Sequence, residues 1–66
     1  MAESTRVEAA RSAFAAVTAA FEDATIIAAD GQATPNLSTA RQSCDRLIEM
    51  VEACLKQLQR LRRQIG

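Results

Sequence analysis

Two thiols, Cys44 and Cys54, are the side chains of this 66-residue chain best suited to nucleophilic chemistry. A cysteine acts as a nucleophile or a metal ligand when a base or further ligands stand near it. The sequence contains no histidine, tyrosine or tryptophan and no Cys-x-x-Cys spacing. Because the commonest general base is missing, we predict neither nucleophilic catalysis nor a metal site.

Two pairs of carboxylates are the other candidates for chemistry. Glu22 and Asp23 are adjacent, so on a helix their side chains point apart, whereas Glu49 and Glu52 are spaced to share one helical face. Glu52 also precedes Lys56 by four residues, the spacing of a solvent-exposed ion pair. No glycine-rich phosphate loop is present. The sequence therefore predicts that the protein is not an enzyme and needs no cofactor.

A basic stripe is formed by Lys56, Arg60 and Arg63, whose spacing places them on one side of a helix, with Arg62 beside them. Such cations can contact phosphates, so anion or nucleic-acid binding is a candidate function of this stripe. The alternative interpretation is a solvated helix end, whose positive charge complements the helix dipole.

The residues just described lie on a segment whose apolar side chains recur every seven residues. The heptad series are Leu37, Cys44, Val51, Leu58 and Ile65 at position a, then Ala40, Leu47, Cys54 and Leu61 at position d. Such a seam buries one stripe of a helix against another helix. Ile48 and Leu55, at position e, widen the stripe. Both cysteines fall within it, so we expect reduced thiols that fill a core.

The N-terminal half has the same periodicity. Its series are Val7, Phe14, Phe21 and Ala28 at a, Ala10, Val17 and Ala24 at d, and Ala13, Ala20 and Ile27 at g. We predict a first helix over about residues 4–29, ended by Gly31, and a loop over 30–36. A second helix follows over about 35–64, with Thr34 as its N-cap and Pro35 at the first helical position. Asn36 and Ser38 are alternative caps.

A short loop between two long helices makes them antiparallel neighbours. We therefore predict an all-α fold, with residues 1–66 forming one antiparallel helical hairpin. Its charge is divided, because residues 1–35 hold five acidic and two basic side chains, and residues 36–66 hold six basic and three acidic ones. We expect this division to place Glu3 and Glu8 beside the arginines of the other end.

Both apolar stripes are wider than one neighbouring helix covers. The sequence therefore predicts that two hairpins pair into a four-helix bundle homodimer, although a different helical protein can complete the bundle as well. The expected self-association core is Phe14, Val17, Phe21, Leu47, Val51, Leu58 and Leu61. The outer side of the first helix is also rich in small residues, so Ala15, Ala19 and Ile26 form a candidate partner surface.

The N-terminal segment Met-Ala-Glu-Ser-Thr-Arg lacks the apolar stretch of a signal peptide. Glu22 and Asp23 interrupt the apolar run of the first helix, and each acid costs roughly 2.5–3.5 kcal/mol near a bilayer centre. We therefore expect a cytoplasmic protein without a membrane partner.

Two heptad-bearing helices around a central loop determine the functional interpretation. In size and layout the chain resembles Rop-type helical hairpins, and it is similar to small hairpin co-chaperones of type III secretion. The first resemblance implies a dimeric bundle that binds RNA. Our principal hypothesis is a non-catalytic protein–protein interaction module, acting as adaptor, co-chaperone or regulator. The alternative is a small nucleic-acid-binding regulator of Rop-like architecture that uses the basic stripe.

Overall fold

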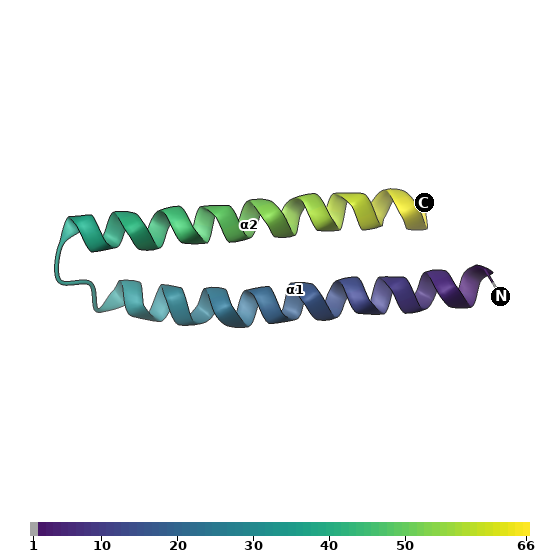
Figure 1. Ribbon diagram of the computed structural model, residues 1–66, viewed down its shortest axis with the longest axis horizontal. Coiled ribbons are helices and arrows are strands. Elements are labelled where there is room, and N and C mark those ends of the chain that lie inside the picture. Colours follow the sequence, from purple (N-terminus) through teal and green to yellow (C-terminus); the bar gives the residue numbers. More distant parts are fainter. Residues whose placement is uncertain (1) are drawn as a thin grey trace.

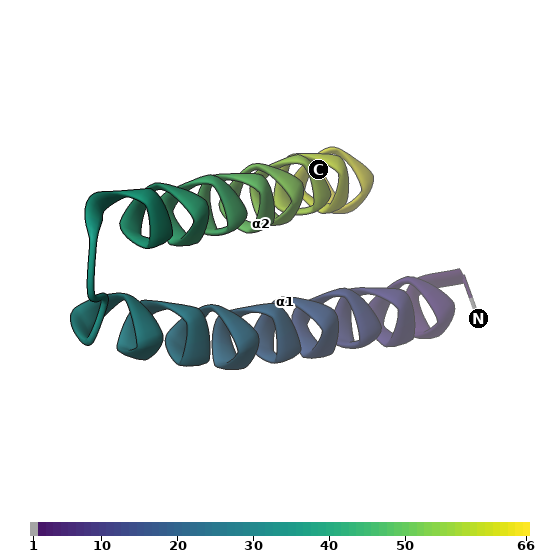
Figure 2. The same cartoon turned by 60° about the vertical axis from the view of Figure 1, so that its left-hand side comes forward.

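The computed structural model describes residues 2–66, with the backbone alone at Ala2. Two helices, α1 (Ala2–Gln32) and α2 (Leu37–Ile65), lie side by side and antiparallel, joined by four residues (Figure 1). Turning the molecule by 60° shows the same pairing along the whole length (Figure 2). The Cα atoms span 53 × 17 × 10 Å, so the chain is a flat slab one helix thick. The predicted all-α antiparallel hairpin is confirmed.

α1 is longer at both ends than the sequence suggested. It begins at Ala2 and continues through Gly31 to Gln32. Gly31 is not the left-handed cap that we predicted, because Gly66 is the residue with a positive φ among those described. The helix instead ends in a tightened turn, in which the N–H groups of Ala33 and Thr34 donate to carbonyls three residues earlier. The residue before a proline disfavours helical backbone, which stops α1 ahead of Pro35.

Asn36 is the N-cap of α2. Its backbone is extended, and its side-chain oxygen accepts hydrogen bonds from the N–H of Thr39 at 2.9 Å and from the Thr39 hydroxyl at 3.1 Å. This satisfies one of the amides that a helix leaves unpaired at its start. Our first choice, Thr34, is not the cap, since its hydroxyl donates to the Asn36 carbonyl. The alternative, Asn36, is correct.

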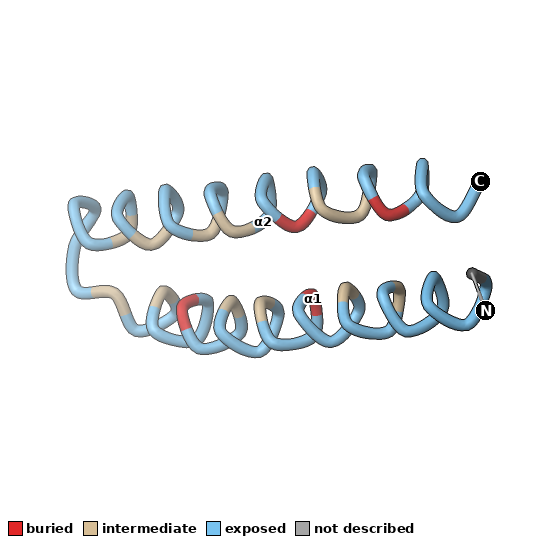
Figure 3. Tube along the Cα trace, turned by 45° about the vertical axis from the view of Figure 1, so that its right-hand side comes forward, coloured by how far each residue is buried: buried red, intermediate tan, exposed pale blue. Residues whose placement is uncertain are grey.

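The buried and half-buried residues of the two helices lie on their facing sides, where the tube is red and tan in Figure 3. These residues form the seam along which the helices meet. On α1 the buried and half-buried residues of this seam are Ala10, Ala13, Val17, Ala20, Ala24, Ile27 and Gly31. On α2 they are Ala40, Ser43, Leu47, Met50, Cys54, Gln57, Leu58 and Leu61. Alternating spacings of three and four residues keep both sets on one side of their helix.

This seam uses heptad positions d and g rather than a and d. The small residues at g, such as Ala13, Ala20 and Ser43, let the helix axes approach each other. The clearest case is the pair of Gly31 and Ser43, where a β-carbon added to the glycine would lie 3.9 Å from that of the serine. Rotation toward the small residues turns the position a residues other than Leu58 out of the seam.

The rotation alters where several predicted core residues lie. Val17, Cys54 and Leu61 are buried between the helices, together with Ile27. Cys44 is exposed in the single hairpin, so the seam between the helices holds Cys54 but not Cys44. The heptad explains the difference, because Cys44 lies at a and Cys54 at d.

Candidate protein–protein interface

Seven large apolar side chains remain outside the seam on one side of the hairpin. This apolar face consists of Val7, Phe14 and Phe21 from α1, and Ile48, Val51, Leu55 and Ile65 from α2. Each is between 43% and 54% exposed, so each is half covered by the hairpin and half open. Neighbouring half-exposed side chains of this size form a patch that soluble monomers rarely display.

Helix geometry places both stripes on the same side. At about 100° per residue, position a lies about 90° round from the centre of a d/g seam, and position e lies a little further in the same direction. The two helices are antiparallel and share a d/g seam, so their a positions turn toward one face of the slab. One surface hollow confirms this at the open end, since Val7, Phe14 and Ile65 line it together.

The polar atoms of the apolar face are already satisfied. Thr18 and Thr25 lie at position e of α1, four residues after the two phenylalanines. Their hydroxyls donate to the carbonyl oxygens of Phe14 and Phe21, at 3.1 and 2.8 Å. A partner can therefore cover this side of α1 without leaving those hydroxyls unpaired, which removes a desolvation cost that an unpaired hydroxyl would add.

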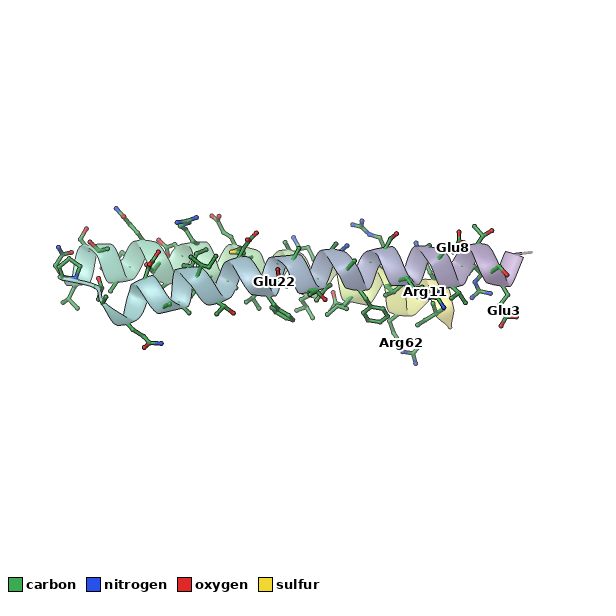
Figure 4. All side chains as sticks on the ribbon, turned by 90° about the horizontal axis from the view of Figure 1, so that it is seen from below. Glu3, Glu8, Arg11, Glu22 and Arg62 are labelled. Carbon is green, nitrogen blue, oxygen red and sulfur yellow. The ribbon has the colours of Figure 1, made fainter. Side chains whose placement is uncertain are left out.

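Charged side chains border the apolar face. Arg11 and Glu22 stand on the side of α1 turned away from α2, whereas Glu8 and Arg62 point toward opposite faces of the slab (Figure 4). Arg41 and Arg62 flank the apolar residues of α2 at position e, with Asp45 nearby at position b. The arrangement is an apolar centre with a polar rim, the usual anatomy of a protein interface.

The other predicted surfaces lie elsewhere on the hairpin. Ala19 and Ile26 are exposed at position f, on the side of α1 turned away from the apolar face, whereas Ala15 is exposed at position b, the position that Glu22 occupies on the rim. Lys56, Arg60 and Arg63 are exposed at positions c and f of α2. They share the side of the slab that faces away from the apolar face.

A hydrogen bond of Arg6 joins the two helices at the open end of the hairpin. The Arg6 guanidinium donates to the carbonyl oxygen of Gln64 at 2.6 Å. A basic residue of α1, rather than Glu3 or Glu8, thus makes this contact with the end of α2, although the charge division suggested the acids. The guanidinium of Arg62 in turn donates to the Gly66 carbonyl, and the Gly66 N–H donates to the Arg62 carbonyl.

The two thiols are free, one exposed and one buried. Within residues 2–66, no cluster of three or more cysteine or carboxylate side chains is arranged to hold a metal ion. The segment Glu3–Gln32 is long and apolar enough to cross a membrane by length and composition, a property shared by core helices of soluble proteins and by signal sequences.

Comparison of the chain with protein-family models, with curated protein sequences and with solved structures gives no match.

Proposed function

We propose that this protein is a non-catalytic protein–protein interaction module, a small helical hairpin that self-associates through its apolar face and acts as an adaptor, co-chaperone or regulator. The observation that supports it best is the apolar face itself. Covering the exposed half of each of its large side chains is worth on the order of 1 kcal/mol. Summed over the face, this favours a partner over exposure to water.

The proposed contact explains the width of the a/d stripe. In a four-helix bundle every helix has two neighbours, and its a/d stripe points between them toward the bundle axis. The d/g side of each helix faces the other helix of its own hairpin. The a/e side is then left for a second hairpin. In this proposal Phe14, Phe21 and Val51 complete the core that Val17 and Leu61 begin.

Sedimentation or light scattering with two matched substitutions tests the proposal. Phe21→Glu places a charge in the middle of the apolar face, whereas Ile26→Glu places the same charge at an exposed apolar residue on the other side of α1. We expect the wild type and Ile26→Glu to have twice the 7.1 kDa chain mass and Phe21→Glu to be monomeric. A monomeric wild type, or equal masses for both variants, contradicts the proposal.

The basic stripe supports a second candidate function, nucleic-acid binding. Lys56, Arg60 and Arg63 face away from the apolar face, so they stay accessible when that face is covered. Titration of labelled RNA and DNA at several salt concentrations tests it, since phosphate binding weakens steeply as salt rises. The matched variant is Arg60→Glu with Arg63→Glu. If no binding is seen at low salt, or if this variant binds as well as the wild type, the basic stripe is not a nucleic-acid-binding site.

The alanine-rich side of α1 is our candidate surface for a different helical protein. Small side chains at Ala15 and Ala19 permit close approach of another helix. In the isolated protein, Ala15→Glu and Ala19→Glu should leave helicity and mass unchanged, because both positions are exposed and glutamate is a good helix former. A loss of self-association in either variant would show that this side belongs to the self-association contact.

A further inference from the structure

The residues at position a form four layers across the hairpin. Two anchors set the height of the helices relative to each other: Val7 and Ile65 line one hollow, and Gly31 lies beside Ser43. Because the heptads run in step between these anchors, each a residue of α1 stands level with one of α2. The layers pair Val7 with Ile65, Phe14 with Leu58, Phe21 with Val51, and Ala28 with Cys44.

These layers are unequal in volume, which distinguishes the two symmetric ways of stacking a second copy face to face. With both loops at the same end, the small layer of Ala28 and Cys44 meets its own equivalent and leaves a void. With the loops at opposite ends, the small layer meets the larger layer of Val7 and Ile65. The two phenylalanine layers then meet each other. The second arrangement fills the bundle more evenly than the first.

The charges on the rim favour the same arrangement. With the loops at opposite ends, the symmetry axis passes midway between the Phe14 and Phe21 layers. Arg11 then comes about 3 Å in height from Glu22 of the second copy, and Arg62 comes equally near to Asp45 of the second copy. Symmetry makes each pair occur twice. With the loops at the same end, Arg62 is instead placed nearly level with Arg11 of the other copy, so the two like charges repel.

The size of the face suits a partner of this length. A second slab laid along the 53 × 17 Å face covers an area on the order of the ~800 Å² per partner that stable complexes bury. With the loops at opposite ends, Leu55 of one copy also lies against Leu55 of the other at the centre of the contact.

We propose that the apolar face is occupied by a second copy of this chain in antiparallel orientation, with the loops at opposite ends, so that α1 packs on α1 and α2 packs on α2. This inference rests on the proposed self-association and adds its geometry. It predicts which residues approach across the symmetry axis and which are held apart.

Single-thiol cross-linking measures the geometry directly. In a Cys44→Ala, Cys54→Ala background, Leu55→Cys puts one thiol beside the axis. Cys54→Ala alone leaves the native thiol of Cys44, which the proposed arrangement separates from its equivalent by about 30 Å of helix. Each variant is treated with a short bifunctional maleimide at the concentration where its mass has been measured. The treatment lasts for the time that a monofunctional maleimide needs to label its thiol fully, because the covered face slows the reaction of both thiols. We expect most of the Leu55→Cys variant to become covalent dimer, and the Cys44 variant to remain uncross-linked.

If the Cys44 variant cross-links and the Leu55→Cys variant does not, and both have dimeric mass, the proposed orientation is wrong but self-association stands. A monomeric mass overturns both proposals. Charge reversal gives a second test that spares the core. Arg11→Glu should weaken the dimer several-fold, and adding Glu22→Arg should restore it. If the loops were at the same end, Arg11→Glu would instead relieve the repulsion from Arg62 and strengthen the dimer, which would contradict the proposal.

Discussion

Gly31 of α1 lies against Ser43 of α2, close enough that an added β-carbon would make an ordinary contact of 3.9 Å with the serine β-carbon. The glycine is helical, so its left-handed freedom is not used there. Gly31 is the smallest residue of the seam, to which α1 contributes mostly small side chains. The helix axes approach closely at this height, next to the loop.

Gly31→Ala should therefore stabilise the protein. Alanine fits the space and lowers the backbone entropy lost on folding, which is worth roughly 0.4–1 kcal/mol where the backbone of the glycine suits alanine. Chemical denaturation followed by circular dichroism, at one fixed protein concentration, measures the change in unfolding free energy. Gly31→Leu is the matched control and should destabilise by overpacking. A loss of stability in Gly31→Ala would mean that the glycine adopts the left-handed cap suggested by the sequence.

Asn36→Ala should cost about 1 kcal/mol of unfolding free energy, because it removes the side-chain acceptor for the Thr39 amide. The loop offers a control in Thr34→Val, which deletes a single hydroxyl bond to the Asn36 carbonyl. We expect Thr34→Val to have the smaller effect. If Thr34→Val lowered the unfolding free energy more than Asn36→Ala, Thr34 rather than Asn36 would be the N-cap of α2.

Helix existence and pairing were predictable because they depend on periodicity, which a sequence displays directly. The residues at which the helices begin and end were harder to predict. Thr34, Asn36 and Ser38 are all residue types that cap helices, and local chemistry alone does not choose among them. Gly31 was read as a stop, although its packing against Ser43 gives a glycine another use. For Gly31 the deciding contact is with Ser43 of the other helix, which no local pattern contains.

The candidate interface was predictable only as a stripe. A heptad pattern gives the residues that avoid water, but it does not give the rotation of each helix about its axis. Phe14 and Val17 therefore looked equivalent, whereas Val17 is 8% exposed in the seam and Phe14 is 53% exposed on the apolar face. The missing signal was side-chain size, since small residues at position g draw the seam toward themselves.

Leu61→Ala and Leu37→Ala should differ sharply. Leu61 is 6% exposed between the helices, so its truncation leaves a cavity and should cost roughly 2–4 kcal/mol. Leu37 is 87% exposed at the start of α2, and its truncation should change the unfolding free energy by less than about 0.5 kcal/mol. Denaturation of both variants at equal concentration checks the ranking. If both variants lost the same unfolding free energy, the core would follow the a/d heptad positions of the sequence rather than the d/g seam.

The reactivity of the two thiols should separate hairpin burial from burial by a second copy. Cys54 is buried in the hairpin itself and should react slowly with a thiol reagent in every folded state. Cys44 is exposed in the hairpin and belongs to the small layer that a second copy covers. We therefore expect Cys44 to react slowly in concentrated wild-type protein.

In the Phe21→Glu variant the apolar face is open, so Cys44 should be labelled rapidly while Cys54 stays protected. Denaturant provides the control, because both thiols should then react at the rate of a free cysteine. Mass spectrometry of peptides assigns each label to its residue. If Cys44 is labelled rapidly in the wild type at every concentration, nothing covers its end of the apolar face. If Cys44 is labelled slowly in Phe21→Glu, the hairpin alone protects this thiol.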